Sequence, residues 1–188
     1  MLLIQYLEEI NGENIKKQII ELENTAWKPS ELENDISFPS SPNTYVTSFI
    51  LIENNHVISH AAIRKTLFIH NGKEYLAYGL SEVVTHPNYQ KKGLGLKIIK
   101  KAAEFIINKS PDISIFTCDP LKINFYKKAG WQPFTSTCFV GGTKLKPFRS
   151  DSLGLTTMIM FLSDKANFNK HEFENTDIIF ELGEKQLW

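Results

Sequence analysis

The chain has 188 residues, of which 42% are apolar and 22% charged, close to the usage of ordinary globular proteins. This composition excludes long disorder, a collagenous fold and a coiled coil, and it suits one domain over residues 1–188 with a substantial core. Lysine plus arginine equal aspartate plus glutamate at 21 each, so no overall basic field favours a nucleic acid or an anionic membrane as a partner.

Charge is nevertheless spread unevenly along the chain. Residues 1–43 carry eight acidic side chains against three lysines, whereas residues 86–109 carry six lysines and one acid, Glu104. This distribution suits a cationic partner at one part of the molecule and an anionic partner at another. It equally suits the solvated faces of surface helices, and the sequence leaves both interpretations open.

The cysteines, the histidines and the first residues indicate the cellular compartment and whether a metal site is expected. Cys118 and Cys138 form neither a disulfide framework nor a zinc spacing, and the five histidines share no metal-like spacing, so we expect buried, inert thiols and no metal site. The start, MLLIQYLEEINGENIKK, lacks the basic region and the long apolar run of a signal peptide. We therefore expect a cytoplasmic protein without a membrane span.

The N-terminal part predicts a strand and then a helix. Residues 2–6 form a short apolar run, and after the Asn11-Gly12 break residues 13–23 place isoleucine and leucine at helical spacing. Residues 28–43, rich in proline, serine and asparagine, predict a loop that could cover a binding site as a lid, with one helical turn at 30–35.

Antiparallel strands follow in the middle of the chain. Residues 45–52, 57–69 and 75–85 read as strands, and the dipeptide Asn71-Gly72 is a strong hairpin signal between the last two.

Helices and strands alternate in the remainder. The apolar spacing of residues 94–108 predicts an amphipathic helix, followed by a strand at 113–117, a short helix at 121–128 ended by Gly130, and strands at 131–140 and 156–162. The fold class is therefore α+β, with a mixed, mainly antiparallel sheet. Edge strands near the C-terminal end would permit a homodimer.

The stretch HPNYQKKGLGLKIIKKAAEF, residues 86–105, turns a strand abruptly into a helix through two glycines. Gly93 and Gly95 allow positive φ and close approach of a ligand, and the following helix offers unpaired N–H groups and a positive dipole end. The junction thus suits a diphosphate, although the glycines could also serve only a tight turn. The Walker and dinucleotide-binding patterns do not match, which disfavours ATP and NAD.

Two motifs carry a resemblance to a known family. VVTHPNYQKKGLG resembles the Q/R-x-x-G-x-G/A motif of the GNAT family of N-acetyltransferases, at Gln90, Gly93 and Gly95, and DPLKINFYKKAGW resembles that family's tyrosine-bearing helix and following strand. The resemblance covers most of the chain. It implies a GNAT-like sheet with strands splayed at the cofactor cleft, and acetyl-CoA as the cofactor. It also implies the cofactor-binding residues Val83, Val84, Thr85, Gln90, Lys91, Lys92, Gly93, Leu94, Gly95, Asp119 and Tyr126.

A narrower similarity is to the aminoglycoside 2'-N-acetyltransferases, in which a terminal tryptophan lines the antibiotic site. It rests on residues 56–134 and on Trp188. Gln186 and Ser81 depart from the acidic residues of that subfamily. The substrate-binding residues that we expect from this similarity and from the distribution of acids are Asp35, Glu82, Thr117, Asp151 and Trp188.

The resemblance also implies how the reaction proceeds. The amine attacks the thioester directly, so we find no need for a nucleophilic side chain, and residues 80–85 would pair with the pantetheine arm at a bulge. Glu82 is the expected base, through a water, with Ser81 as the alternative because a register slip exchanges the two. Tyr126 is the expected general acid for the departing thiolate.

Three functions remain open at this point. The first is acetylation of an amine of a small molecule, an aminoglycoside foremost, which would be an antibiotic-resistance activity. The second is acetylation of a peptide or protein amine, and the third is a non-catalytic CoA-binding sensor.

Overall fold

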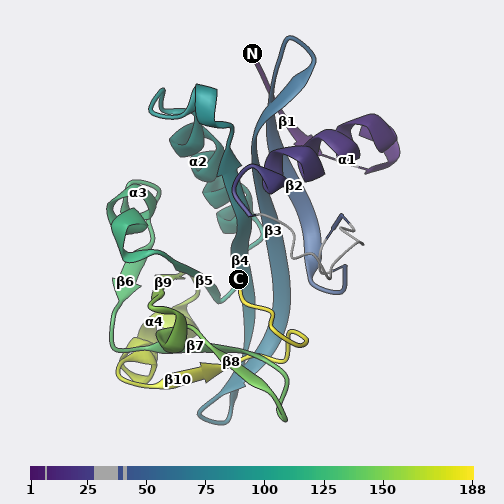
Figure 1. Ribbon diagram of the computed structural model, residues 1–188. Coiled ribbons are helices and arrows are strands. Elements are labelled where there is room, and N and C mark those ends of the chain that lie inside the picture. The colour runs from purple at the N-terminus through teal and green to yellow at the C-terminus, as the bar shows by residue number, and fades with distance from the viewer. Residues whose placement is uncertain (7, 28–37, 40–41) are drawn as a thin grey trace. The chain divides into compact units, whose positions relative to one another are not determined.

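The computed structural model describes residues 1–6, 8–27, 38–39 and 42–188 (Figure 1). Two compact units divide the chain: residues 1–64 with 81–102, and residues 65–80 with 103–188. Three long elements run from one unit into the other: β3 (His56–His70), β4 (Lys73–Thr85) and α2 (Leu94–Asn108). The prediction of a single domain over residues 1–188 stays a prediction.

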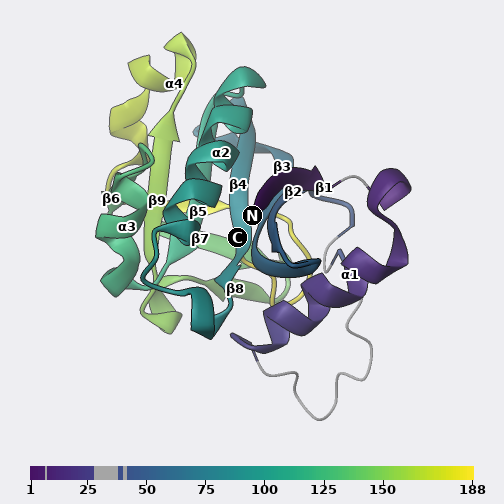
Figure 2. The same ribbon diagram turned by 90° about the horizontal axis from the view of Figure 1, so that it is seen from above.

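The first unit is an antiparallel sheet with helices. Its elements, besides parts of the three long ones, are β1 (Leu2–Tyr6), α1 (Glu8–Asn24), β2 (Tyr45–Glu53) and the 3-10 turn η1 (Pro87–Tyr89). The strand order is β1-β2-β3-β4, and β2 turns into β3 at Asn54 and Asn55, both with positive φ. Figure 2 shows α1 on one side of β1 and β2 and the beginning of α2 on the other.

Apolar side chains from α1 and from the strands make the core of the first unit. Ile19 and Leu22 of α1 pack with Tyr6 of β1 and Ile50 of β2. Side chains at positions 19 and 22 lie on one helix face because residues three apart are neighbours on a helix surface. Gly12 interrupts α1 with φ 65°, which agrees with the break expected at Asn11-Gly12, although the helical stretch begins earlier than expected, at Glu8.

The second unit contains part of the main sheet and a smaller sheet. Its elements are β5 (Ile113–Cys118), η2 (Pro120–Lys122), α3 (Ile123–Lys127), β6 (Gln132–Phe134), β7 (Cys138–Gly142), β8 (Pro147–Arg149), η3 (Asp151–Leu153), β9 (Thr156–Phe161), α4 (Asp164–Phe168), η4 (Lys170–Phe173) and β10 (Asp177–Ile179). In the main sheet β4 pairs with β5 in parallel, and β9 pairs with β5 and β6 antiparallel. The smaller sheet has the order β10-β7-β8.

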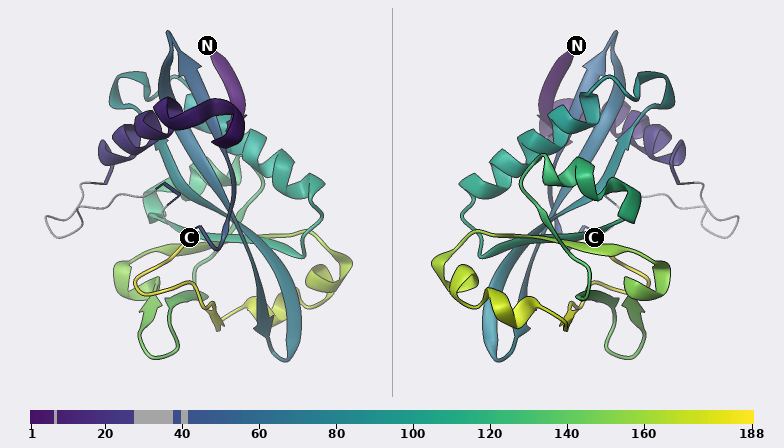
Figure 3. Two further views of the ribbon diagram at one scale, coloured as in Figure 1. Left: turned by 90° about the vertical axis from the view of Figure 1, so that its right-hand side faces the viewer. Right: turned by 90° about the vertical axis from the view of Figure 1, so that its left-hand side faces the viewer.

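The predicted hairpin at Asn71-Gly72 is confirmed. Both residues have positive φ, 47° and 73°, as a two-residue turn between twisted strands requires. Figure 3 shows β3 and β4 as one long twisted ribbon that ends at this turn. The predicted helix at residues 94–108 is also confirmed, residue for residue.

The prediction of one strand over residues 131–140 is wrong. The segment forms two strands, β6 and β7, which belong to different sheets: β6 pairs with β9, and β7 pairs with β8 and β10. The interruption lies at residues 135–137, where the N–H of Thr137 donates to the carbonyl of Phe134 and closes a turn. The strands β8 and β10 and the helix α4 were not predicted from the sequence.

The predicted fold class, an α+β fold with a mixed and mainly antiparallel sheet flanked by helices, is confirmed. Both cysteines are buried, as expected. None of the helices in the described part of the chain has the length and apolar character that a membrane crossing requires. The expected lid at residues 28–43 lies mostly outside the described residues.

Candidate active site

The turn between η1 and α2 has the predicted positive φ at Gly93, whereas Gly95 lies inside α2 and does not have positive φ. Lys91 and Gly93 both have positive φ, 60° and 79°, and a Cβ added at Gly93 would meet no atom within 4 Å. Gly93 accepts the first helical hydrogen bond, from the N–H of Lys97 at 3.1 Å. The N–H groups that open α2 therefore have no partner within the helix and face an uncrowded turn.

Side chains of the same turn hold it in shape. Gln90 Nε2 donates to the carbonyl of Thr85 at 3.0 Å, and Lys92 Nζ donates to the carbonyl of Asn88 at 3.0 Å while lying over the ring of Tyr89. Gln90 and Lys92, expected to bind the cofactor, thus also bind the loop. Lys91 is exposed beside them.

A diphosphate fits this turn on three observations. The N–H groups at the start of α2 are donors, the helix dipole places positive charge there, and Gly93 presents no side chain. Lys91 and Lys92 add two cationic side chains next to the turn.

Glu82 interrupts β4. Its φ is 55°, a left-handed conformation that a non-glycine residue seldom adopts inside a strand, and β4 changes there from four buried residues at 77–80 to three half-buried residues at 81–83. The carboxylate of Glu82 accepts from Arg64 Nη2 at 2.5 Å. Ser81 makes no side-chain hydrogen bond within the described residues, so of the two alternatives it is Glu82 that joins a polar cluster.

That polar cluster was not foreseen as a group. Carboxylate oxygens of Glu23 and Glu82 and an imidazole nitrogen of His60 all lie within 4.8 Å of one another. His60 is fully buried, and its Nδ1 lies 2.9 Å from Glu23 Oε1. We name Glu23, His60, Arg64 and Glu82 the polar cluster of the first unit.

A sequence signal for the cluster existed in β3. In the apolar run VISHAAIR, His60, Ala62 and Arg64 are spaced by two, which places them on one face of a strand, and all three are buried. Charged or titratable groups on a buried strand face need partners, and those partners come from α1 and β4. The pairing across elements is what the sequence does not reveal.

Burial and the neighbouring charges shift the pKa of Glu23 within the cluster. Burial raises the pKa of Glu23, the contacts with His60 lower it, Glu82 raises it and Arg64 lowers it, with a net increase. Glu23, His60 and Glu82 are ligand types that a metal ion accepts, but the guanidinium of Arg64 already holds Glu82. The arrangement is therefore a buried cluster of polar groups that contains the Arg64–Glu82 ion pair.

In the second unit, Tyr126 lies in an aromatic group. Its ring meets those of Phe116 and Trp131 edge to face, with centroids 4.8 and 6.5 Å apart, and Trp131 Nε1 donates to Ser114. Burial, and next the nearby Cys118, raises the pKa of Tyr126 above its ordinary value. The phenol is therefore a hydrogen-bond donor throughout the physiological range.

Thr117 and Trp188, both expected at the substrate site, are in contact with each other. The main-chain N–H and the hydroxyl of Thr117 donate to the carbonyl oxygen of Trp188 at 2.7 and 2.6 Å. The indole packs against Gly79 so closely that a Cβ there would come within 2.5 Å of the ring. Asp119, expected to bind the cofactor, caps η2, because its carboxylate accepts a hydrogen bond from the N–H of Leu121.

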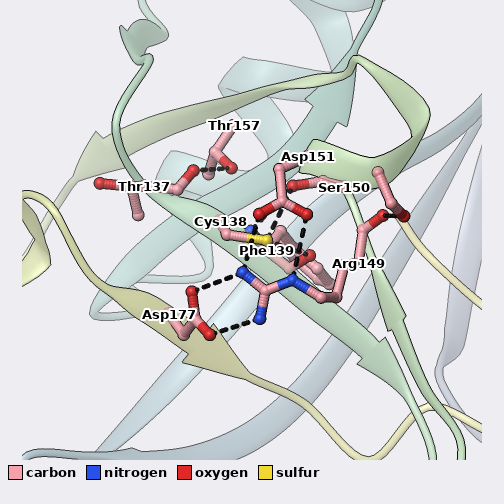
Figure 4. A network of polar contacts seen from close by, with 9 residues as sticks. Thr137, Cys138, Phe139, Arg149, Ser150, Asp151, Thr157 and Asp177 are labelled. Carbon is pink, nitrogen blue, oxygen red and sulfur yellow. Dashed lines mark hydrogen bonds and ion pairs between the residues drawn. The ribbon is translucent and has the colours of Figure 1, made fainter.

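Asp151 is paired with a cation. Arg149 donates to both oxygens of Asp151, at 3.0 and 2.7 Å, and also to Asp177 (Figure 4). The hydrogen bonds from Arg149 lower the pKa of Asp151 to about 2. A cationic substrate at Asp151 would thus compete with Arg149. Asp35, the remaining predicted residue, lies outside the described residues.

Comparison with known proteins now decides the family. The model of the acetyltransferase (GNAT) domain matches residues 12–134 of the chain. The chain belongs to the GNAT acetyltransferase family. The predicted family and enzyme class are thereby confirmed, whereas the aminoglycoside 2'-N-acetyltransferase subtype stays a prediction. No curated protein sequence matches the chain.

Solved structures agree with this GNAT fold. A GNAT N-acetyltransferase of Escherichia coli (YhbS), solved with CoA, gives a TM-score of 0.65 at 9% identity, covering 96% of this chain and 89% of its own. A GNAT acetyltransferase of Brucella melitensis, solved with acetyl-CoA, gives 0.53 at 19% identity, covering 70% and 83%. These identities are too low to carry more than the fold.

Some structures of this fold are much longer than the chain. A protein of Enterococcus faecalis described as a probable N-acyltransferase gives a TM-score of 0.57 at 16% identity and covers 71% of this chain. The chain spans 33% of that protein's length.

Proposed function

We propose that the chain transfers the acetyl group of acetyl-CoA to an amine of a small molecule, with aminoglycosides as the foremost substrate class. The single observation that supports acetyl-CoA as the acetyl donor is the glycine turn before α2 in a chain of the GNAT family. This turn has N–H groups available to a ligand and positive φ at Lys91 and Gly93. Residues 90–95 would hold the diphosphate, and residues 83–85 would pair with the pantetheine arm.

In the reaction that we propose, the acceptor nitrogen loses two protons. An ammonium gives one proton to a base, the free amine attacks the thioester carbon, a C–N bond forms and the C–S bond breaks. Nitrogen then loses its second proton, and the departing thiolate gains one. The products are an acetamide, CoA thiol and one net proton.

Glu82 is the proposed base. Its carboxylate lies on an irregular point of β4, it is mostly buried with 13% of the side chain exposed, and a second carboxylate, that of Glu23, lies in the same polar cluster. Such a site favours an ammonium, which is the form of a small amine at neutral pH.

Tyr126 is the proposed acid. Because burial raises the pKa of its phenol, the O–H stays intact at neutral pH and is able to donate to a thiolate. Ser81 remains the alternative hydrogen-bonding group on β4. Thr117 and Trp188 are proposed for the acceptor site because they form one hydrogen-bonded pair. The expected homodimer and cytoplasmic setting stay predictions.

A panel of acceptors tests the proposal. Purified protein is mixed with acetyl-CoA and kanamycin-type sugars, gentamicin-type sugars, simple diamines or lysine peptides, and free thiol is followed. We expect turnover with the sugars. Turnover only with peptides would move the acceptor to a protein amine, and binding of acetyl-CoA by calorimetry without any turnover would leave a CoA-binding sensor.

Mutation of the turn tests the donor separately. Gly93→Ala forces a side chain onto a residue with φ of 79°, so we expect the affinity for acetyl-CoA to fall by tenfold or more. Gly154→Ala, at φ 66° directly after η3, is the matched control and should leave acetyl-CoA affinity unchanged. Equal affinities of the Gly93 variant and the wild type would remove this turn from the cofactor site.

A further inference from the structure

A cavity of 520 Å³ lies in the first unit, and we name it the α1 cavity. Its walls come from α1, from the turn between β2 and β3 with the start of β3, and from η1. Residues 90–95 do not line it, although η1 directly precedes them in the chain. The volume falls within the range of about 300–1,000 Å³ that is typical of small-molecule pockets.

Hydrogen bonds hold the three walls of the α1 cavity together. Gln18 Oε1 of α1 accepts from the N–H of Val57 at 2.8 Å, and the N–H of His86 donates to the carbonyl of Ile58 at 2.9 Å. The imidazole of His86 also caps η1, because its Nδ1 accepts from the N–H of Asn88 at 3.2 Å. The cavity is therefore formed before any ligand binds.

The α1 cavity has an apolar floor. Leu22, Val57 and Ile58 line it, although each of these side chains is almost fully buried, at 3%, 6% and 2% exposed. Apolar groups of a ligand that cover this floor leave water, which favours binding. The floor thus suits a ligand with an apolar part.

Two carboxylates from different elements also line the α1 cavity. Glu21 comes from α1 and Glu53 from the end of β2. Among the described residues that line the cavity there is no lysine or arginine. The charge of the lining therefore favours a cationic ligand over an anionic one.

A metal ion is not the cation that these side chains suit. Within the described residues, the His, Asp and Glu side chains close enough to share a metal ion are those of Glu23, His60 and Glu82. None of these three lines the α1 cavity. An organic cation with an apolar body matches both the carboxylates and the floor.

The α1 cavity is linked to the glycine turn through Tyr89. Burial raises the pKa of the Tyr89 phenol, and so do the charge of Glu53 and a hydrogen bond to its carboxylate. Lys92 Nζ, at the glycine turn, lies 5.0 Å from the centroid of the same ring. Because acetyl-CoA is an anion, the negative charge of Glu53 opposes its binding nearby, and a cation beside Glu53 offsets this repulsion.

We propose that the α1 cavity is a second binding site, for an organic cation with an apolar body, and that its occupation strengthens the binding of acetyl-CoA at the glycine turn. The cation site stands on the cavity alone. The coupling rests on the proposed function, in which residues 90–95 hold the diphosphate.

Two probes of similar size and opposite charge test the cation site. Benzyltrimethylammonium has a quaternary nitrogen with no proton to lose, so it cannot be acetylated and does not report turnover. Benzylsulfonate carries the opposite charge. In calorimetry with the full chain and without acetyl-CoA, we expect the ammonium to bind and the sulfonate not to bind at the same concentration. Equal binding of the two, or no binding of the ammonium, would overturn the proposal.

Variants of the lining place the bound probe. Glu53→Gln should weaken the binding of benzyltrimethylammonium about fivefold, the size expected for a partly exposed ion pair. Glu21→Gln should do the same, and it decides the matter if the Glu53 variant does not fold. Glu13→Gln, on α1 but outside the cavity with 75% of its side chain exposed, is the matched control and should bind as the wild type. Wild-type binding by both cavity variants would rule out this cavity as the site.

Titration of acetyl-CoA with and without saturating benzyltrimethylammonium tests the coupling. We expect the affinity for acetyl-CoA to rise about threefold, and the rise to disappear at about 1 M salt, where charges are screened within roughly 3 Å. By reciprocity, acetyl-CoA should raise the affinity for the cation by the same factor.

The outcomes separate this inference from the proposed function. An acetyl-CoA affinity that does not change when the cation is bound would reject the coupling. If the chain binds no acetyl-CoA at all, the proposed function fails, whereas the titrations with the two probes still decide whether the α1 cavity binds a cation.

Discussion

The two units hold their candidate catalytic side chains by different physical means. In the first unit Glu82 is fixed by charge and hydrogen bonds in the polar cluster, with Arg64, His60 and Glu23 around it. In the second unit Tyr126 is fixed by packed rings, chiefly Phe116 and Trp131. Charge depends on protonation and ring packing does not, so the two regions should respond differently to pH.

Removing the cation of the polar cluster should have the largest effect. Arg64→Met keeps much of the volume of a side chain that is 1% exposed, but it removes the guanidinium that pairs with Glu82 and acts on Glu23. We expect the free energy of unfolding to fall by about 3–5 kcal/mol at pH 7.

This loss should decrease as pH is lowered. The pKa of Glu23 is already raised, chiefly by burial, so this carboxyl takes up a proton before an ordinary one and relieves the uncompensated charge. Urea unfolding at pH 7 and pH 5 measures the difference. A loss of the same size at both values would contradict the electrostatic account of this region.

The ring-packed region provides the matching test. Trp131 is fully buried, and Trp131→Ala leaves a large cavity and an unpaired Ser114 hydroxyl. We expect a loss of about 3–5 kcal/mol that does not change between pH 7 and pH 5. Leu145→Ala, at a side chain 92% exposed, is the control and should cost less than about 0.5 kcal/mol.

Tyr126→Phe should have a smaller effect, on catalysis alone. The ring contacts remain and only the hydroxyl is lost, so we expect kcat to fall tenfold or more with little change in acetyl-CoA affinity or stability. Because the pKa of Tyr126 is raised by burial, wild-type kcat should not decline through loss of this proton below about pH 10.

Tyr75→Phe is the control for this variant. Tyr75 lies fully buried in another aromatic group of the same unit, and its hydroxyl has no role in the proposed reaction. An unchanged kcat in folded Tyr126→Phe protein would remove Tyr126 from the mechanism.

Asp112 should show the smallest effect and a pH dependence of its own. Burial raises the pKa of Asp112, but hydrogen bonds from Lys165, the Leu76 N–H and Ser163 lower it further, and the net change is a decrease. Because the pKa of Asp112 is lower in the folded than in the unfolded chain, where it is about 3.9, ionised Asp112 stabilises the folded state at pH values above the unfolded pKa. This contribution is lost as the pH falls through the pKa of the folded state.

Asp112→Asn should therefore cost about 1–2 kcal/mol at pH 7, and the difference from the wild type should disappear toward pH 2. Denaturant unfolding over this range measures it. A difference that persists unchanged at pH 2 would show that shape, and not charge, is what Asp112 contributes.

Local patterns determined several parts of the molecule correctly. The strand-to-helix junction with Gly93, the hairpin at Asn71-Gly72 and the helix at residues 94–108 depend on turn chemistry and periodicity within a few residues. The same local logic failed at residues 131–140. A continuous apolar run gives no sign that its two halves pair with strands of different sheets.

The sequence by itself determined the family, the helix that follows the glycine turn and the types of side chain available for catalysis. Only the tertiary structure decided that Glu82, and not Ser81, enters the polar cluster, and that Glu23 and His60 lie beside it. The physical reason is the separation along the sequence of the residues that interact. Turns and helices follow from neighbours along the chain, whereas a buried charge takes its partners from whichever elements pack against it, here 18 to 59 positions away for Arg64 and Glu23 relative to Glu82.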